Sequence, residues 1–457
     1  MVQRMFGTNG VRGVVNEDMN TDLALQMGKA IGKFFNGTVA IATDTRVSGD
    51  MIKAAVSAGL MATGCTVRDL GVVPTPAIQY HVKTDDDVVG GVMITASHNP
   101  PKFNGIKCID GDGTEMPREK EEQIEVLYAS EIPCQSWNDI GSMETYGNAG
   151  EDYIDAVLRH VDVAAIRKAG LTAVLDCANG AACRTTPLLL KKLGVRAVTL
   201  NADMQGEFPG HPSEPTAENL RDLLYLTKAV NADIGIAHDG DADRAVFATN
   251  DGSFVPGDKS LALMAKSTVL ANGGGLIVTP VSSSSMVEEV VNKAGGKLIY
   301  TAVGSPVVAR RMMAEGSKFG GEENGGLIFA EHQYCRDGAM TIAKMIESIV
   351  KFGPLLKQIQ ELPVYYTDKR KIECPNNRKS DLIEHMKGKF SPGNKVDLTD
   401  GMKILFSDGG WVLLRPSGTE PIFRIYSESK NKDLAEQRCG EFESAAKAFM
   451  GAAEESE

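Results

Sequence analysis

Three aspartates at alternate positions, Asp239, Asp241 and Asp243, have residue types and a spacing that suit a metal site. They follow the apolar run 233–237, which predicts a buried strand. Two carboxylates about 4 Å apart repel by roughly 4 kcal/mol at an effective dielectric of about 20, so three together call for a cation. Oxygen ligands favour Mg²⁺, Mn²⁺ or Ca²⁺, although the loop lacks the Gly and Glu of an EF-hand. A solvated acidic turn is the alternative interpretation.

Ser97 is a second candidate, in the segment 95–100. It follows the apolar run 88–94, which predicts a buried strand that stops abruptly before Asn-Pro. Such a strand end is expected to leave the Ser97 hydroxyl exposed as a nucleophile or phosphate carrier. An ordinary turn is the alternative, because Ser and Asn-Pro are common turn residues.

A third group of residues suits a phosphate dianion. Arg415 offers a guanidinium fork, Ser417 and Thr419 offer hydroxyls, and Gly418 lets backbone N–H groups approach closely. A simple hairpin turn is the alternative.

The glycine-rich segment 321–326 carries Glu322 and Asn324, which suit sugar hydroxyls, although a mobile acidic loop has the same composition. Arg12 and Lys107 are further cations near predicted loops, and Lys107 is placed to reach the same site as Ser97. A surface lysine is the alternative for Lys107. Asp44 and Arg46 lie in another predicted loop and receive no role.

The elements that must position these loops repeat along the chain. Strand, polar loop, helix, glycine and strand follow one another from about residues 38, 172 and 276, which predicts three copies of one α/β unit. Ligands of open α/β sheets bind beyond the carboxyl ends of the strands, so the loops after the strands should face one cleft. A helix is predicted over 21–36 with Thr21 as its N-cap. The predicted domains are 1–147, 148–249, 250–358 and, with a different texture, 359–457.

Composition excludes several function classes. The 457 residues are 42% apolar and 24% charged, and the formal net charge of -12 argues against nucleic acid and anionic membranes as partners. None of the eight cysteines lies in a Cys-x-x-Cys pair, and no apolar stretch approaches 18 residues. A cytoplasmic protein with buried, reduced thiols is expected.

Five segments in order resemble the α-D-phosphohexomutase family over essentially the whole chain. They are residues 6–13, 95–100 with 104–107, 239–244, 321–326 and 415–421. The resemblance implies an α/β fold of three similar α/β domains with mixed sheets plus a smaller C-terminal α+β domain, arranged around one central cleft.

The same resemblance implies roles for individual residues. Ser97 would carry a phosphoryl group, and its phosphoserine oxygen would hold one Mg²⁺ together with Asp239, Asp241 and Asp243. By the same resemblance Lys107 would be the general acid/base, Glu322 and Asn324 would bind the sugar, and the phosphate that is not transferred would be clamped by Arg415, Ser417, Gly418 and Thr419. Charge neutralisation suits Arg12 and Arg244 as cations around the transferred group. His98 is expected to orient the phosphoserine only because it is adjacent to Ser97.

The implied reaction interconverts glucosamine 6-phosphate and glucosamine 1-phosphate through a sugar 1,6-bisphosphate, which would also act as activator. Residues 6–13 resemble the phosphoglucosamine mutase branch. The sugar loop departs from the bacterial pattern, with Asn324 and Gly326 in the places of a Ser and a His, and is similar to archaeal members. Phosphomannomutase and phosphoglucomutase activities therefore stay open as alternatives.

Two other classes also stay open. A haloacid-dehalogenase-like sugar phosphatase would use Asp239 as nucleophile and Asp241 as acid, and would not need Ser97. A sugar-phosphate or cation sensor would bind without turnover. The expected partner is a small hexose phosphate, and the chain is expected to be a monomer or a homodimer.

Overall fold

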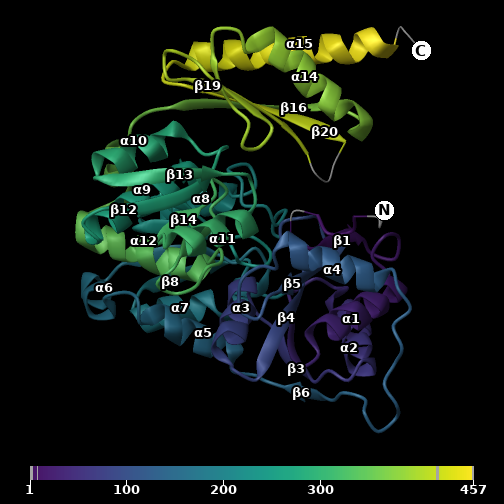
Figure 1. Ribbon diagram of the computed structural model, residues 1–457. Helices are drawn as coiled ribbons and strands as arrows, with labels where there is room; N and C mark the ends of the chain where they lie inside the picture. Colours follow the sequence, from purple (N-terminus) through teal and green to yellow (C-terminus); the bar gives the residue numbers. More distant parts are fainter. Residues whose placement is uncertain (1–3, 8, 418–420, 455–457) are drawn as a thin grey trace.

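The computed structural model describes residues 4–7, 9–417 and 421–454, which form four successive sheets with helices around them (Figure 1). The first sheet consists of β1 (Val11–Val14), β2 (Thr38–Thr43), β3 (Val67–Val72), β4 (Val88–Ile94), β5 (Phe103–Ile109) and β6 (Met143–Thr145). Its strand order is β1-β5-β4-β2-β3-β6, and β1 and β5 are antiparallel to their neighbours. The accompanying helices are α1 (Thr21–Phe35), α2 (Gly49–Ala62), α3 (Thr75–Thr84) and α4 (Arg118–Tyr128).

The second sheet repeats the centre of the first. It consists of β7 (Thr172–Asp176), β8 (Arg196–Leu200), β9 (Ile234–His238), β10 (Ala245–Thr249) and β11 (Phe254–Val255), in the order β11-β10-β9-β7-β8. Its helices are α5 (Ala149–Leu158), α6 (Val163–Ala169), η1 (Ala181–Arg184), α7 (Thr186–Leu193) and α8 (Arg221–Ala229).

The third sheet repeats the same centre once more. It consists of β12 (Gly275–Pro280), β13 (Gly296–Thr301), β14 (Phe319–Gly321) and β15 (Leu327–Phe329), in the order β13-β12-β14-β15. Its helices are α9 (Gly257–Ala271), α10 (Ser285–Lys293), α11 (Ser305–Glu315), α12 (Gly338–Phe352) and α13 (Leu355–Gln360).

The predicted repetition is confirmed by the pairing of these strands. In each of the three sheets a central strand (β2, β7 or β12) lies parallel to both neighbours. One of those neighbours then pairs antiparallel with the next strand, as β4–β5, β9–β10 and β14–β15. The connections of these three antiparallel pairs carry Ser97, Asp239 to Asp243, and Glu322. Equivalent loops of three copies therefore hold the predicted chemistry.

The fourth sheet is antiparallel throughout. It consists of β16 (Tyr366–Glu373), β17 (Lys395–Asp397), β18 (Met402–Leu405), β19 (Trp411–Pro416) and β20 (Ile422–Ser429), in the order β16-β20-β19-β18-β17. η2 (Asn376–Arg378), α14 (Lys379–Phe390) and α15 (Lys432–Glu454) complete this part, and both long helices lie on one side of the sheet (Figure 1).

Three of the apolar clusters explain how the parts are joined. One apolar cluster continues through the first three sheets and includes Met93, Phe247 and Phe319. The fourth part has its own core, to which β19 contributes Val412 and Leu414. The alternate residues of β19, Trp411 and Leu413, pack instead with Val281 of the third part. This is possible because successive side chains of a strand point to opposite faces of the sheet. The first three parts thus share one core, and the fourth attaches through one face of its sheet.

Some local expectations change. The N-cap of α1 is Asn20, whose Oδ1 accepts the Leu23 N–H at 2.9 Å; the predicted cap at Thr21 is wrong because Thr21 is already helical. β11 belongs to the second sheet although it lies beyond residue 249. The four domain ranges and the single central cleft stay predictions. Within the part of the chain that the structure describes, no helix is long and apolar enough to cross a bilayer.

The close approach of α1 and α2 generates a testable expectation. A Cβ at Gly59 of α2 would lie 2.3 Å from the Leu25 carbonyl oxygen and 2.7 Å from the Lys29 nitrogen of α1. We expect Gly59→Ala to destabilise the protein by about 1–3 kcal/mol, because backbone atoms cannot move aside as a side chain can. The midpoint of urea unfolding, followed by circular dichroism, measures the change.

The matched control is Gly388→Ala in α14, where an added Cβ meets no atom within 4 Å. At this exposed helical position Ala is favoured over Gly by about 0.5–1 kcal/mol, so the control should be neutral or stabilising. Equal midpoints for the two variants would contradict the described packing of α1 on α2.

Candidate active site

The loop after β4 holds Ser97 in a constrained position. Ser97 has a φ of 52°. Its N–H donates to Thr95 Oγ1 at 2.8 Å, and the Thr95 hydroxyl donates to Asp44 Oδ2 at 2.6 Å. The side chain is fully buried, so the expectation of an exposed hydroxyl is wrong. The reason is the acidic loop of the second sheet, which packs directly onto it.

Arg46 supports the Ser97 loop through its backbone carbonyls. Its guanidinium is buried and donates to four backbone carbonyls of the loop and its exit, those of Ser97 (2.8 Å), Asn99 (2.6 Å), Pro100 (2.8 Å) and Phe103 (2.9 Å). Asp44 accepts from Arg46 Nε at 3.1 Å and balances its charge. The sequence marks Asp44 and Arg46 only as a charged pair in a loop, and the structure makes them the support of the Ser97 loop.

The loop after β9 brings the aspartates to Ser97. The Ser97 Oγ donates to Asp239 Oδ2 at 2.8 Å. Gly240 permits this approach, because a Cβ there would lie 2.6 Å from the Ser97 carbonyl oxygen. Burial, with smaller contributions from Asp243 and Asp241, raises the pKa of Asp239. The hydroxyl and the acidic group therefore share one buried space.

Asp241 is the most strongly paired carboxylate of the three. Its Oδ2 accepts from Lys107 Nζ at 2.7 Å and from Thr75 Oγ1 at 2.7 Å, two side chains from the first sheet's part of the chain. Burial alone would raise the pKa of Asp241, but the Lys107 ammonium and these hydrogen bonds outweigh it and hold the pKa well below its usual range. Lys107 therefore reaches the Ser97 site, as expected.

The acidic group fits a divalent cation. One oxygen from each of Asp239, Asp241 and Asp243 lies within 4.8 Å of the others, and all three side chains are buried. Asp241 Oδ1 and Asp243 Oδ1 have no hydrogen-bond partner among the described atoms. Unpartnered buried carboxylate oxygens that converge are ligands suited to Mg²⁺.

The neighbouring cations and imidazole surround the same space. Arg12 donates to Asn99 Oδ1 at 2.8 Å. Arg244 Nε lies 3.8 Å from both Asp239 Oδ2 and Asp243 Oδ1. His98 Nδ1 lies 3.4 Å from Ser97 Oγ. Burial, reinforced by Arg244 and Arg12, lowers the pKa of His98 to about 2, so its ring is neutral at any working pH.

His238, which ends β9, is a packing residue rather than a ligand. Its ring is fully buried, with Nε2 2.9 Å from Thr186 Oγ1 and Nδ1 2.9 Å from the Arg244 carbonyl oxygen.

The loop between β14 and β15 lies against the acidic group. The Gly325 carbonyl accepts from Ala245 N at 3.1 Å, which joins this loop to β10. Glu322 is buried, and Asn324 Nδ2 lies 3.5 Å from its Oε2. Burial raises the pKa of Glu322, and Arg336 opposes that rise. Arg336 contacts both Glu322 and Asp243 and was not singled out from the sequence, because no local pattern connects residues so far apart.

The predicted phosphate clamp lies apart, in the fourth sheet. Arg415 Nε donates to Asp400 Oδ2 at 2.7 Å, and Lys379 Nζ donates to the Ser417 carbonyl at 2.5 Å. Gly418 and Thr419 lie outside the described residues. The structure thus brings together the predicted residues of the first three sheets and places Arg415 and Ser417 in the fourth part.

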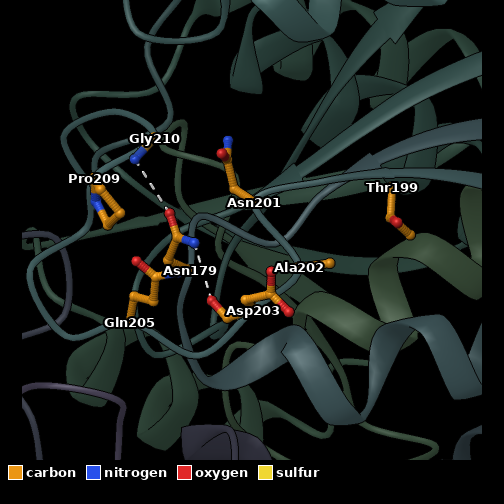
Figure 2. A pocket seen from close by; sticks show the side chains of 8 residues that line it. All are labelled: Asn179, Thr199, Asn201, Ala202, Asp203, Gln205, Pro209 and Gly210. Atoms are coloured by element: carbon orange, nitrogen blue, oxygen red, sulfur yellow. Dashed lines mark hydrogen bonds between the residues drawn. The ribbon is translucent and has the colours of Figure 1, made fainter.

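A hollow of about 510 Å³ in the second part is separate from this site (Figure 2). Asn179 spans it, with Nδ2 donating to the Asp203 carbonyl at 2.9 Å and Oδ1 accepting from Gly210 N at 3.3 Å. Thr45 Oγ1 donates to the Asn179 carbonyl at 2.8 Å, so the wall of the hollow also joins the first two parts. Its eight lining residues include none of the predicted site residues.

The role of Arg46 can be tested by Arg46→Lys, which keeps the charge but loses the planar fork. A lysine cannot satisfy four carbonyls at once, and each buried group left unpaired costs about 1–3 kcal/mol. We expect a stability loss of about 3 kcal/mol and faster amide hydrogen exchange confined to residues 95–103. Hydrogen-exchange mass spectrometry measures the second effect.

Arg68→Lys is the control, since Arg68 also bridges two carboxylates, Asp85 and Glu144, but on β3, beside the edge strand β6. Surface pairs of this kind contribute about 0–1 kcal/mol. Unchanged exchange over 95–103 in Arg46→Lys would refute the supporting role.

Comparison with known proteins gives consistent matches along the chain. A relative from Thermococcus kodakarensis, named phosphoglucomutase/phosphomannomutase, is 43% identical over 95% of this chain and 96% of its own. A relative from Methanopyrus kandleri, named probable phosphoglucosamine mutase, is 40% identical over 96% and 97%. The crystal structure of a phosphoglucomutase/phosphomannomutase family protein from Burkholderia thailandensis superposes with a TM-score of 0.86 at 26% identity, over 98% of both chains.

The four domain families of phosphoglucomutase/phosphomannomutase match in order. Alpha/beta/alpha domains I, II and III match residues 3–133, 151–252 and 256–366, and the C-terminal domain matches residues 370–445. The expected architecture of three α/β domains and a C-terminal α+β domain is confirmed. With these matches and the shared arrangement of loops, the chain belongs to the phosphoglucomutase/phosphomannomutase family, the α-D-phosphohexomutases.

Proposed function

We propose that this phosphohexomutase interconverts glucosamine 6-phosphate and glucosamine 1-phosphate by way of a phosphorylated Ser97 and a sugar 1,6-bisphosphate. One observation carries the proposal: the Ser97 hydroxyl donates to Asp239 inside a buried group of three aspartates that Lys107 also contacts. A seryl oxygen beside a carboxylate site for a divalent cation has the parts that phosphoryl transfer needs, positioning and charge neutralisation.

Asp239, Asp241 and Asp243 would hold one Mg²⁺, with an oxygen of phosphorylated Ser97 as a further ligand. The ion would supply charge neutralisation for the transferred phosphoryl group. Asp241 Oδ1 and Asp243 Oδ1, which are buried and accept no hydrogen bond from the described atoms, support this assignment. Phosphoserine adds about -1.5 to -2 charges near neutral pH, so Arg12 and Arg244 are also needed around it.

In the proposed step, a free hydroxyl oxygen of the sugar forms a bond to phosphorus while the bond between phosphorus and Ser97 Oγ breaks. The proton released by the hydroxyl reaches the seryl oxygen, with Lys107 Nζ as the group that relays it. The resulting 1,6-bisphosphate reorients within the site, so that its other phosphate faces Ser97 and is transferred back to the seryl oxygen. The same bisphosphate would serve as activator for unphosphorylated enzyme. His98, whose Nδ1 lies 3.4 Å from Ser97 Oγ, would orient the phosphoserine as a hydrogen-bond partner.

Glu322 and Asn324 would bind sugar hydroxyls, and Arg415, Ser417, Gly418 and Thr419 would hold the phosphate that is not transferred. Glucosamine is favoured by residues 6–13 and by the name of the Methanopyrus kandleri relative. Mannose and glucose phosphates are the alternatives, favoured by the name of the Thermococcus kodakarensis relative. We further propose that the enzyme works in the cytoplasm, as a monomer or homodimer, on small hexose phosphates without nucleic acid or membrane.

A sugar phosphatase with Asp239 as nucleophile is the second reaction class. The short contact from Ser97 Oγ to Asp239 weighs against it, because the seryl oxygen already occupies the approach to that carboxylate. The alternatives are separated by following products rather than loss of substrate.

Purified protein with Mg²⁺ and a trace of glucose 1,6-bisphosphate should convert glucosamine 6-phosphate to glucosamine 1-phosphate. We expect kcat/KM for glucosamine 6-phosphate to exceed that for the mannose and glucose 6-phosphates by about tenfold, the scale of one well-made hydrogen bond. Phosphorus NMR follows both esters, and removal of Mg²⁺ with a chelator should stop the conversion. Free phosphate as the main product would instead support the phosphatase.

Ser97→Ala should abolish conversion, with at least a 10³-fold loss, because no oxygen remains to carry the group. Intact and peptide mass spectrometry of the native protein should find partial phosphorylation of Ser97. The matched control is Ser57→Ala, a buried serine of α2 outside the site, which should keep its activity. Full activity of Ser97→Ala would refute the phosphoserine mechanism.

A further inference from the structure

Gly326, at the end of the sugar loop, leaves room for the side chain of another residue. A Cβ at Gly326 would lie 2.3 Å from Arg336 Cδ and 3.0 Å from Arg336 Cγ. Neither atom has free space to withdraw, since Arg336 is only 6% exposed. The absence of a side chain at residue 326 is therefore a condition for the position of Arg336.

The backbone around Arg336 is fixed on both sides. Arg336 forms an antiparallel bridge with Ile328, and the Asp337 N–H donates to the Leu327 carbonyl at 2.9 Å. Asp337 is the N-cap of α12 and accepts the Met340 N–H at 2.9 Å. Arg336 is thus held in a connection between β15 and α12 whose backbone is hydrogen-bonded on both sides. From there its guanidinium reaches the sugar loop that precedes β15.

The Arg336 guanidinium joins carboxylates from three domains. Nη1 donates to Glu322 Oε2 at 3.2 Å in the third domain, and Nη2 donates to Asp243 Oδ2 at 2.5 Å in the second. Nη2 also lies 3.7 Å from Glu115 Oε1 of the first. Glu115 in turn accepts from Ser305 Oγ at 2.5 Å and from Asn9 Nδ2. A planar fork can hold two carboxylates at a set separation, which a lysine cannot.

We propose that Arg336, seated against Gly326, is a positioning residue for the mutase reaction. It holds the sugar-binding Glu322 at a fixed place relative to Asp243, and so keeps the sugar site in register with the acidic metal site across two domains. The inference rests on the proposed function and extends it, since a bisphosphate that must be held in two orientations requires both sites at one spacing.

Two variants with different chemistry test the pair. Arg336→Lys keeps the charge and loses the fork, while Gly326→Ala keeps the arginine and displaces it. For each we expect KM for glucosamine 6-phosphate to rise about tenfold and kcat/KM to fall about 100-fold, because misplacement of a binding group by about 1 Å has effects of this size. The double variant should be no worse than the poorer single variant by more than about threefold, since both changes remove one arrangement.

Arg370→Lys is the control, because Arg370 bridges Asp368 and Glu443 within the fourth domain, away from the site. It should keep kcat and KM within twofold of the wild type. If Arg336 only supports the fold, its variants will lower the unfolding midpoint while KM and kcat of the folded enzyme stay near wild type, and the proposal is overturned. If the fold-losses in kcat/KM of the two single variants multiply in the double variant, the two changes act independently, and the pairing of Gly326 with Arg336 is overturned.

Failure of the proposed mutase function can be distinguished from failure of the positioning role of Arg336. A wild-type protein that converts no hexose phosphate refutes the mutase assignment, and calorimetric titration with glucosamine 6-phosphate then decides about Arg336. Binding weakened about tenfold in both single variants supports the positioning role without turnover. Equal binding by wild type and variants refutes it.

Discussion

The buried carboxylates of the acidic loop are the constraint on which the rest of the structure depends. Asp239, Asp241 and Asp243 are all withdrawn from water, and charges so placed are tolerated only when they are paired. Their partners come from different parts of the chain. Lys107 belongs to the first domain, Arg244 follows the loop itself, and Arg336 belongs to the third. The arrangement of three domains around one point is therefore also the arrangement that neutralises this loop.

The same constraint explains why the three domains share a core while the fourth does not. A loop that needs cations from both neighbours must keep those neighbours at a fixed distance, and a continuous apolar cluster through the first three sheets does so. Among the described residues, the hydrogen bonds and ion pairs of the three aspartates come from the first three domains. It packs on the third through Trp411 and Leu413, whose strand faces its own core with the alternate side chains. A domain attached by one sheet face can change its angle without disturbing the acidic loop.

Most of the framework could be predicted from the sequence, because local patterns determine it. Glycines after helices, apolar runs and polar loops predict the three repeats, and Ser97, the aspartates and Glu322 lie in their equivalent connections. Arg12 and Lys107, expected near loops, lie on strands β1 and β5. What failed depends on contacts between distant residues. The burial of Ser97 follows from the approach of Gly240, which lies in another domain. Arg46 acts on carbonyls 51 or more residues away, and Arg336 contacts Glu322 at 14 residues and Asp243 at 93. Gly326 departs from the bacterial pattern of the sugar loop and so marks a local difference in the sequence. Only the structure identifies Arg336 as the side chain that fills the space beside it.

A continuous series of contacts connects the predicted clamp to the acidic loop. Arg415 is held by Asp400, and the same Asp400 oxygen accepts the Val303 N–H at 2.9 Å in the third domain. Two residues on, Ser305 donates to Glu115, which lies beside Arg336 and hence beside Asp243. The proposed reaction uses both phosphates of a hexose 1,6-bisphosphate in turn. Each contact in this series is a charged or hydrogen-bonded pair, so the series couples the position of the predicted clamp to that of the acidic loop. This coupling involves no atom of the sugar ring, and relatives of the chain bear the names of several hexose phosphates.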